Sequence, residues 1–246
     1  MNNRTALVTG GASGLGLAIA QKLVTEGYHT IVIGRNENKL LQAKEQLGSN
    51  CSIYPFDLTD LQHLPDLVER LYQAHEKIDV LVNNAGIHLK KPALEVSDAE
   101  FQQVITTNLT AVFCLSREIA KRMLPQSGGS IINISSMAAI YGIPQVIAYT
   151  AAKSGIEGMT RAMAVEWSAH GIRVNCIAPG FIATNMSSKA MDNDPERKQK
   201  VLSRTPMGAF GRPEDVAEAA CFLASEASGF ITGTVLPVDG GNAIGF

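Results

Sequence analysis

The stretch Thr9-Gly-Gly-Ala-Ser-Gly-Leu-Gly16 decides the fold of this chain. It follows a short β-branched run, Thr5–Val8, and overlaps the start of an amphipathic segment, Gly14–Glu26, so it connects a predicted strand to a predicted helix. Its glycines permit a tight turn, a close approach of the backbone to a phosphate, and packing of the helix on the strand. A helix that begins here points its N–H groups and positive dipole end at that phosphate. The stretch therefore predicts a site for the pyrophosphate of a dinucleotide.

Short β-branched runs and longer amphipathic segments alternate along the rest of the chain. Strands are predicted at Thr5–Val8, Thr30–Gly34, Ser52–Phe56, Val80–Asn83, Ser130–Ser135, Arg173–Ala178 and Thr234–Val238. Helices are predicted at Gly14–Glu26, Asn36–Leu47, Leu61–His75, Asp98–Leu124, Ala148–Ala169 and Pro213–Ala224. Such alternation favours parallel strands joined by right-handed crossovers. We expect residues 1–246 to form a single-domain α/β Rossmann fold, a doubly wound, parallel, seven-stranded sheet with helices on both faces.

One stretch, Gly180–Pro206, breaks this rhythm because it is polar and irregular. It follows directly on the end of a predicted strand. Irregular connections of this length in compact domains are usually functional. We therefore expect residues 180–206 to form a substrate loop that acts as a lid.

The composition excludes several classes of protein. The 246 residues are 46% apolar and 18% charged, which fits one folded domain with a full core. A formal net charge of -2 disfavours nucleic-acid binding, and no apolar run approaches the ~20 residues of a membrane helix. No signal peptide is recognised, so we expect a cytoplasmic protein. The four cysteines lie far apart in the sequence, without the spacing of a metal site or a redox motif.

Tyr149 and Lys153 stand four residues apart in the predicted helix Ala148–Ala169 and therefore share one face of it. An ammonium group beside a phenol favours the phenolate and lowers the phenol pKa, which turns a tyrosine into a usable acid or base. Pairs of this kind also occur on solvated helix faces. The interpretation therefore depends on the surrounding motifs.

Those motifs, taken together, resemble the short-chain dehydrogenase/reductase family along nearly the whole chain. The glycine stretch resembles the coenzyme loop of that family, and Asn83-Asn-Ala-Gly86 resembles its segment that stabilises the central sheet. Asp57-Leu58 resembles the pair beside the adenine, and Pro179-Gly180 with Thr184 resembles the turn that receives the nicotinamide. The resemblance implies an oxidoreductase that transfers a hydride between a nicotinamide coenzyme and a ketone or secondary alcohol.

The resemblance also implies four catalytic roles. Tyr149 is the expected general acid in ketone reduction and general base in alcohol oxidation, and Lys153 is expected to lower its pKa and bind the nicotinamide ribose. Ser136 is expected to donate a hydrogen bond to the substrate oxygen, with Ser135 as the alternative. Asn108 is expected to kink its helix and to order a water that links Lys153 to solvent.

Coenzyme preference is expected at the end of the second strand, where Arg35 stands in place of the acidic residue typical of NAD-dependent enzymes. A guanidinium binds a phosphate through two hydrogen bonds, so NADP(H) is favoured over NAD(H). The alternative is a surface pair between Arg35 and Glu37, and Ser13 stands where many NADP-preferring relatives carry a second basic residue. The full set of expected cofactor contacts is Gly10, Ser13, Gly14, Leu15, Gly16, Arg35, Asp57, Leu58, Asn84, Ala85, Gly86, Tyr149, Lys153, Pro179, Gly180, Ile182 and Thr184.

The substrate remains open between two classes. Much of the chain, including the ending Ile231–Gly241, resembles bacterial 3-oxoacyl-acyl-carrier-protein reductases, yet Ser127 and His170 stand where those enzymes tend to carry arginines that dock the carrier. The segment Asn84–Pro92 resembles sugar and polyol dehydrogenases of the gluconate 5-dehydrogenase kind. We expect a carbonyl reductase of the first kind, with the second as the alternative. A catalytically silent NADP-binding regulatory module is the alternative of another class, and the intact set of four catalytic residues argues against it.

Three further expectations concern the pocket and the assembly. Ile143, Val146 and Met186 are expected to line the substrate pocket, and His88 is expected to be a solvent-facing loop residue. The family resemblance implies a homotetramer. Helix Asp98–Leu124 agrees with it, because its apolar residues cover more than one core-facing stripe: Val104, Ala111, Phe113, Leu115 and Ile119.

Overall fold

The computed structural model describes residues 4–126, 128–184 and 195–245. Its sheet has seven parallel strands in the order β3-β2-β1-β4-β5-β6-β7. The strands are β1 (Thr5–Thr9), β2 (His29–Gly34), β3 (Cys51–Pro55), β4 (Val80–Asn83), β5 (Gly129–Ile134), β6 (Ile172–Pro179) and β7 (Val235–Val238). The order reverses direction between β1 and β4, as in a doubly wound sheet, so the expected single-domain Rossmann fold is confirmed.

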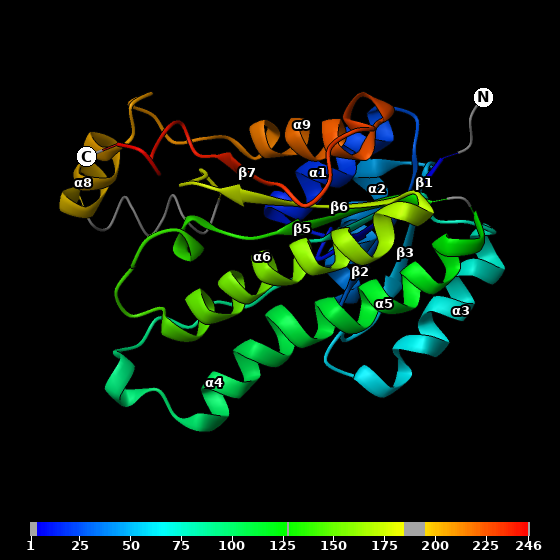
Figure 1. Cartoon of the computed structure of the whole chain (residues 1–246), viewed down its shortest axis with the longest axis horizontal. Coiled ribbons are helices and arrows are strands. Elements are labelled where there is room, and N and C mark those ends of the chain that lie inside the picture. The colour runs from blue at the N-terminus through cyan, green and yellow to red at the C-terminus, as the bar shows by residue number, and fades with distance from the viewer. Residues whose placement is uncertain (1–3, 127, 185–194, 246) are drawn as a thin grey trace.

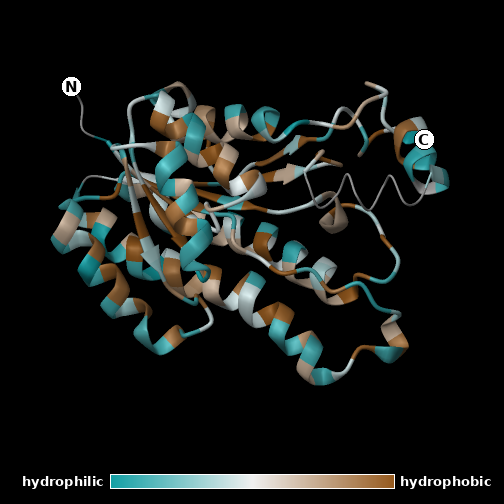
Figure 2. Cartoon of the chain, turned by 180° about the vertical axis from the view of Figure 1, so that it is seen from behind, coloured by the Kyte–Doolittle hydropathy of each residue, from teal (hydrophilic) through white to brown (hydrophobic). Residues whose placement is uncertain are grey.

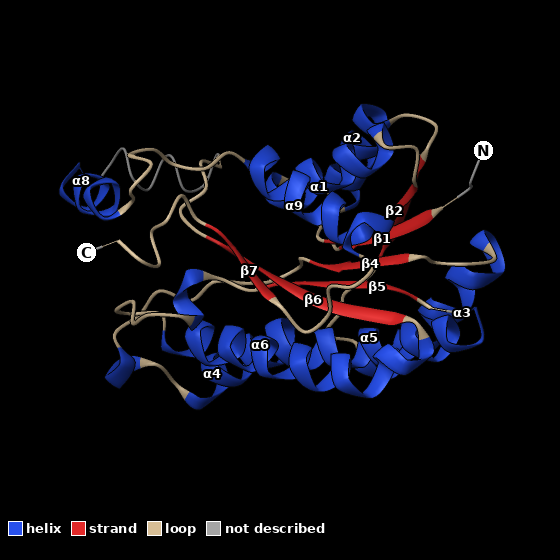
Figure 3. Ribbon diagram, turned by 45° about the horizontal axis from the view of Figure 1, so that its top comes forward, coloured by secondary structure: helices blue, strands red, loops and turns tan. Residues whose placement is uncertain are grey.

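Helices cover both faces of the sheet (Figure 3). One layer holds α1 (Gly14–Thr25), α2 (Glu37–Leu47) and α9 (Pro213–Ala224). The other holds α3 (Leu64–His75), α4 (Asp98–Ile105), α5 (Ala111–Met123) and α6 (Ile147–Trp167). Hydrophobic residues gather on the strands between the two layers, whereas hydrophilic residues lie mainly on the outer helix faces (Figure 2).

The sheet is buried on both sides, which explains the continuous apolar runs of its strands. In β1 the side chains of Ala6 and Val8 pack into the core cluster beneath α1 and α9, while Leu7 packs into the cluster beneath α3 and α5. This alternation follows from the two-residue period of a strand. All five residues of β1 are buried, so the strand holds the glycine turn that follows it in a fixed position.

The long helix predicted at Asp98–Leu124 is interrupted in the structure. A π-helix over Thr106–Thr110 separates α4 from α5. Asn108 lies in this π-helix and is fully buried, with its side-chain amide turned to the segment after β4. The prediction of one continuous helix is therefore wrong, although the expected irregularity lies at Asn108.

The stretch predicted to be irregular, Gly180–Pro206, contains helix α8 (Pro195–Arg204). Pro195 begins this helix with the fixed φ of proline, Glu196 lies in its first turn and Arg204 in its last, as the helix dipole favours. The irregular prediction is wrong for these ten residues. Residues 185–194, with Met186, lie outside the described residues. Helix α8 stands apart from both helical layers, beyond the carboxyl ends of β6 and β7 (Figure 1).

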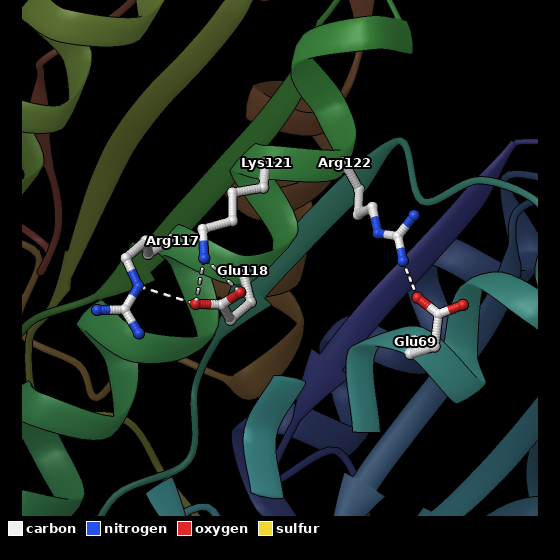
Figure 4. A network of polar contacts seen from close by, with 5 residues as sticks. All are labelled: Glu69, Arg117, Glu118, Lys121 and Arg122. Atoms are coloured by element: carbon white, nitrogen blue, oxygen red, sulfur yellow. Dashed lines mark hydrogen bonds and ion pairs between the residues drawn. The ribbon is translucent and has the colours of Figure 1, made fainter. Parts of the chain in front are cut away.

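Charged side chains connect α3 to α5 on the surface of the second layer (Figure 4). Arg122 of α5 pairs with Glu69 of α3, while Glu118 accepts hydrogen bonds from Arg117 and Lys121. Burial opposes ionisation of Glu118, yet the two cations outweigh it and lower the pKa of this carboxyl. These pairs are partly exposed, so each stabilises the fold only slightly.

Most apolar residues of the predicted helix Asp98–Leu124 are already buried within one chain. Val104, Ala111, Leu115 and Ile119 are at most 2% exposed, whereas Phe113 is 39% exposed. The surplus apolar surface expected on this helix is therefore limited to Phe113 among those five residues. Among the described residues, no helix combines the length and the apolar character needed to cross a membrane.

A pair of histidines lies at the opposite end of the sheet from the glycine turn. The His29 and His75 rings are 5.0 Å apart, His29 is hydrogen-bonded to Ser52, and His75 to Tyr54. Burial lowers the pKa of both histidines, and Lys44 and His29 respectively add to the effect. Both imidazoles are therefore favoured as neutral groups in the folded protein.

This pair predicts a loss of stability in mild acid. Below about pH 6.5 the unfolded chain binds protons that the folded chain resists, so the free energy of unfolding decreases as the pH falls through that range. In the double variant His29→Gln, His75→Gln this decrease should be smaller than in the wild type. Urea unfolding at pH 7.5, 6.5 and 5.5 measures it. Equal slopes in the two proteins would contradict the assignment.

Candidate active site

The glycine turn has the geometry that its sequence predicts. Gly10 and Gly14 have φ values of +66° and +53°, which side-chain-bearing residues rarely adopt. A Cβ atom on Gly16 would lie 2.4 Å from the carbonyl oxygen of Gly10 and from the Asn84 side chain. The turn therefore folds back tightly on the first turn of α1, and its amide groups line the space beyond β1.

Side chains from β1 and from the segment after β4 fix the shape of this turn. The Asn84 side-chain amide donates hydrogen bonds to the carbonyl oxygens of Thr9 and Gly10, at 3.0 and 3.3 Å. The Thr9 hydroxyl accepts hydrogen bonds from the amides of Asn84 and Ala85, both at 3.0 Å. Asn83 turns to the other side, where it donates to Ser116 and to Asn133. The segment therefore holds both the central sheet and the glycine turn.

A cleft of about 290 Å³ extends from the turn across the ends of β2 and β3. Arg35 and Asp57 both line it and form an ion pair at 3.7 Å, so the surface pair of Arg35 with Glu37 is not the one observed. Burial opposes ionisation of Asp57, but hydrogen bonds from Thr59 and the charge of Arg35 outweigh it and lower the carboxyl pKa. The cleft is lined by Gly10, Ser13, Leu15, Gly16, Ile33, Gly34, Arg35, Phe56, Asp57, Leu58, Asn84, Ala85, Gly86, Ile87 and Thr107.

The cleft continues into a larger cavity of about 720 Å³, which we call the catalytic cavity. Leu15, Asn84, Gly86 and Ile87 line both. The catalytic cavity lies over the carboxyl ends of β5 and β6, where doubly wound sheets bind their ligands. Its other lining residues are His88, Lys90, Ile134, Ser135, Ser136, Ala138, Ile143, Pro144, Val146, Tyr149, Lys153, Pro179, Gly180, Phe181, Ile182 and Thr184.

Ser136 and Tyr149 meet in the catalytic cavity. Ser136 follows β5 and Tyr149 lies in the first turn of α6, and Ser136 is close enough to lower the pKa of Tyr149. Ser135 is buried and donates instead to Glu157, at 2.8 Å, and to the carbonyl of Lys153. The geometry therefore favours Ser136 over Ser135 as the group that can reach a ligand oxygen beside Tyr149.

Lys153 lies one helical turn below Tyr149 and is 5% exposed. Its Nζ donates to the Ile134 carbonyl at 2.6 Å and lies 5.6 Å from the centre of the Tyr149 ring. Burial lowers the pKa of Lys153 to about 8. Burial raises the pKa of Tyr149, while the hydrogen bond from Ser136 acts in the opposite direction. Burial is therefore the larger influence on the pKa of Tyr149 in this geometry, and the lowering expected from Lys153 stays a prediction.

Asn108 is buried and shapes the site by holding the backbone of Ile87. Its amide oxygen accepts a hydrogen bond from the Ile87 amide, and its amide nitrogen donates to the Ile87 carbonyl, each at 2.8 Å. A Cβ on Gly86 would lie 3.2 Å from that amide oxygen, so Gly86 allows the close approach. Asn108 thus fixes the segment where the cleft meets the catalytic cavity.

Two residues of the loop after β4, His88 and Lys90, lie closer to Tyr149 and its cavity than the sequence alone indicates. The His88 ring lies 4.8 Å from the Tyr149 ring, although His88 is an exposed residue, and Lys90 also lines the catalytic cavity. Both lie within four residues after Asn83-Asn-Ala-Gly86, and only this closeness in the sequence could have indicated that they reach the site. Among the expected pocket residues, Ile143 and Val146 line the cavity.

The cleft and cavity fit a dinucleotide coenzyme. The glycine turn offers backbone amides to a pyrophosphate, and Arg35 and Asp57 flank the far end. Tyr149, Ser136 and Lys153 lie at the near end. This combination of fold and site defines a dinucleotide-dependent oxidoreductase.

Comparison with known proteins gives the same class. Residues 10–243 match the family model described as enoyl-(acyl carrier protein) reductase. The chain is 42% identical to a 3-oxoacyl-[acyl-carrier-protein] reductase of Rickettsia bellii over 98% of this chain and 97% of that protein. It is 37% identical to the gluconate 5-dehydrogenase of Gluconobacter oxydans over 98% of this chain and 95% of that enzyme.

A solved structure is similar as well. A putative NAD(P)-dependent gluconate 5-dehydrogenase from Beutenbergia cavernae, with NADP bound at low occupancy, superposes with a TM-score of 0.90 and 40% identity. The match covers 97% of this chain and 96% of that one. The chain belongs to the short-chain dehydrogenase/reductase family, and it is an NAD(P)-dependent oxidoreductase.

Proposed function

We propose that the protein interconverts a ketone and a secondary alcohol with NADP(H), using Tyr149 as the general acid and base. The observation that carries the proposal is that Tyr149, Ser136 and Lys153 line one cavity, which is continuous with the dinucleotide cleft. When bound, the coenzyme supplies or accepts the hydride. Every proton step falls to side chains of this chain.

The side chains divide the work. Ser136 donates a hydrogen bond to the carbonyl oxygen as negative charge develops there, and Tyr149 delivers the proton to the same oxygen. Burial keeps the Tyr149 hydroxyl protonated near neutral pH, which suits the direction of ketone reduction. Lys153 holds its ammonium close to Tyr149 and stabilises the phenolate left after proton transfer. Asn108 positions the loop at Ile87 and, as the family resemblance implies, orders a water beside Lys153.

The preference for NADP(H) rests on Arg35. No carboxylate stands directly after β2, and Arg35 lines the cleft with about 64% of its side chain exposed, so its guanidinium can reach a 2′-phosphate. Its partner Asp57 lies on the adenine side of the cleft. The charge of Arg35 makes this expected preference an electrostatic one.

Replacement of Arg35 tests the preference. We expect Arg35→Ala to weaken NADPH binding by roughly 10- to 100-fold, because a charge-assisted phosphate contact is lost, and to change NADH binding by less than about threefold. Fluorescence titration with each coenzyme measures both constants. Lys39→Ala, which removes a cation of α2 that does not line the cleft, is the matched control. Equal losses for both coenzymes would contradict the role of Arg35.

Two substrate classes remain, and each has support. The sequence relative from Rickettsia bellii favours a 3-oxoacyl thioester, which we retain as the first candidate. His88 above the Tyr149 ring and Lys90 in the cavity wall favour a polyhydroxylated ketone of the gluconate 5-dehydrogenase kind, because both can bind substrate hydroxyls. Oxidation of NADPH in the presence of a 3-oxoacyl thioester, a keto acid and a neutral ketose separates the classes.

Three further properties belong to the proposed function. We expect residues 180–206 to form part of the substrate site, a homotetramer in solution, and a cytoplasmic protein. A catalytically silent NADP-binding module is the alternative, and the geometry of Tyr149, Ser136 and Lys153 argues against it. Sedimentation as a stable monomer would remove the tetramer, and absence of turnover with every ketone would favour the silent module.

A further inference from the structure

A second cavity of about 330 Å³ adjoins the catalytic cavity, and we call it the side cavity. Both are lined by Lys90, Ile143, Pro144 and Phe181, so a ligand held beside Tyr149 can extend from one into the other. The side cavity is completed by Tyr141, Gln145, Lys200, Val201, Arg204 and Asn242. The side cavity and the dinucleotide cleft share no lining residue within the part of the chain that the structure describes.

The charged residues that the structure describes in the wall of the side cavity all have one sign. Lys90, Lys200 and Arg204 line it, and no carboxylate stands among its described lining residues. Lys200 and Arg204 lie four residues apart in α8 and so share one face of that helix, while Lys90 comes from the loop after β4. Two distant segments of the chain therefore bring their cations to one small space.

One of these cations is held in place. The Arg204 guanidinium lies 4.5 Å from the centre of the Tyr141 ring, over its face. The Tyr141 hydroxyl donates a hydrogen bond to the Asn242 side chain, and Asn242 in turn donates to Thr205 at 2.9 Å. The Tyr141 ring is anchored by Asn242, and Thr205, the next residue in the chain, is bonded to the same side chain. Arg204 therefore presents its N–H groups in a restricted orientation.

Two carboxylates near these walls, Asp239 and Glu100, are engaged elsewhere. Asp239 accepts hydrogen bonds from the amides of Gly241 and Ala243, at 3.0 and 2.7 Å. Glu100 pairs with Lys91 and caps its own helix at Ser97. The positive charge of the side cavity is therefore not neutralised by either of these carboxylates.

Apolar walls accompany the charge. Ile143, Pro144, Phe181 and Val201 line the space between the cations. A cavity with apolar walls and a few converging charges suits a carbon chain that ends in an anion. A neutral chain would make no use of the attraction that the three cations offer to an anion.

We propose that the side cavity binds a carboxylate on the substrate itself. Of the two substrate classes that the comparisons support, this favours the keto acid over the 3-oxoacyl thioester, with the ketone of the keto acid reaching Tyr149. This inference rests on the proposed function of the catalytic cavity. A phosphate on the same carbon chain is the other source of this chemistry. The experiment must therefore distinguish carboxylate, phosphate and neutral substrates of equal length.

The test compares three six-carbon ketones with saturating NADPH: 5-ketogluconate, the neutral ketose sorbose, and fructose 6-phosphate. We expect wild-type kcat/KM to be at least about 30-fold higher for the keto acid than for the neutral ketose. In the double variant Lys200→Gln, Arg204→Gln this ratio should fall by roughly 30-fold, mainly through KM. Lys200→Arg should retain the ratio because it keeps the charge. Arg70→Gln, which removes an exposed cation of α3 that lines neither cavity, should leave it unchanged.

Binding without turnover gives an independent reading. Titration calorimetry of 5-ketogluconate into the NADP⁺ complex should give a dissociation constant that the double variant raises by a similar factor. Lys200 and Arg204 are exposed, so the fold should tolerate both substitutions, and melting temperatures check this.

Each outcome decides between the two proposals. Equal use of the keto acid and the neutral ketose, with no effect of the double variant, would overturn the side-cavity inference and leave the ketone reductase in place. A preference for the phosphorylated ketose that the double variant removes would replace the carboxylate by a phosphate. Turnover of none of the three, nor of a 3-oxoacyl thioester, would overturn the proposed function, and the calorimetric titration would then judge the side cavity alone.

Discussion

Replacing Tyr149 with phenylalanine is expected to lower kcat for ketone reduction by about a thousandfold while leaving the dissociation constant of NADPH within about threefold. The change removes one oxygen atom and retains the ring that packs against His88. Proton transfer from a positioned side chain contributes 10²- to 10⁴-fold to a rate, and Tyr149 lines the catalytic cavity beside Ser136. Stopped-flow measurement of a single turnover separates the chemical step from coenzyme release.

The same variant predicts a change in pH dependence. Because burial raises the pKa of Tyr149, the protonated form persists well above neutral pH, and alcohol oxidation, which needs the deprotonated form, should accelerate as the pH rises. Ketone reduction should slow over the same interval. Tyr149→Phe should abolish both trends. Ser135→Ala, which removes a neighbouring hydroxyl bonded to Glu157, serves as the control and should retain them. A profile unchanged in Tyr149→Phe would assign the proton to another group.

Replacing Gly16 with alanine is expected to weaken NADPH binding by at least about 30-fold and to lower the free energy of unfolding by roughly 1–3 kcal/mol, because the added methyl group overpacks a tight turn. Its Cβ would lie 2.4 Å from the backbone carbonyl oxygen of Gly10, and a backbone atom cannot rotate away as a side chain can. The turn must open, and its amides must leave the positions that face the phosphate. Calorimetric titration with NADPH and urea unfolding measure the two effects.

The matched control lies at the other end of α1. Gly27 has a φ of +84°, and a methyl group added there would meet open space, so Gly27→Ala strains the backbone by about 1–2 kcal/mol without touching the cleft. It should lower stability and leave NADPH affinity unchanged. If both variants bind NADPH equally well, the shape of the turn at Gly16 does not control coenzyme binding.

The sheet and the coenzyme turn could be predicted from sequence because both leave strong local patterns. Buried parallel strands read as short apolar β-branched runs, and the glycine stretch must supply positive φ values at Gly10 and Gly14. Tyr149 and Lys153 were recognisable since four residues on a helix fix their relation. In each case neighbouring residues in the sequence determine the geometry.

The remaining features could not be predicted, for physical reasons. A π-helix at Thr106–Thr110 differs from an α-helix by one extra residue in a hydrogen-bonded turn, and composition hardly records it. Helix α8 is short and mostly polar, so its sequence lacks the long apolar stripe from which a helix is usually predicted. The pKa of Tyr149 depends on burial, which no spacing rule contains. The side cavity brings Lys90 together with Tyr141 and Lys200, which lie far from it in the sequence, and only the folded structure shows that they meet.

The position of helix α8 affects how the substrate range of such an enzyme can evolve. Its exposed residues Lys200 and Arg204 line the side cavity, whereas the groups that we propose transfer the proton belong to α6 and to the residues just after β5. Substitutions at exposed positions cost little stability, so mutations in α8 can accumulate without unfolding the scaffold or moving Tyr149. A library randomised at Lys200 and Arg204 should therefore yield new substrate ranges from mostly folded variants. Selectivity in this molecule can evolve separately from its catalytic chemistry.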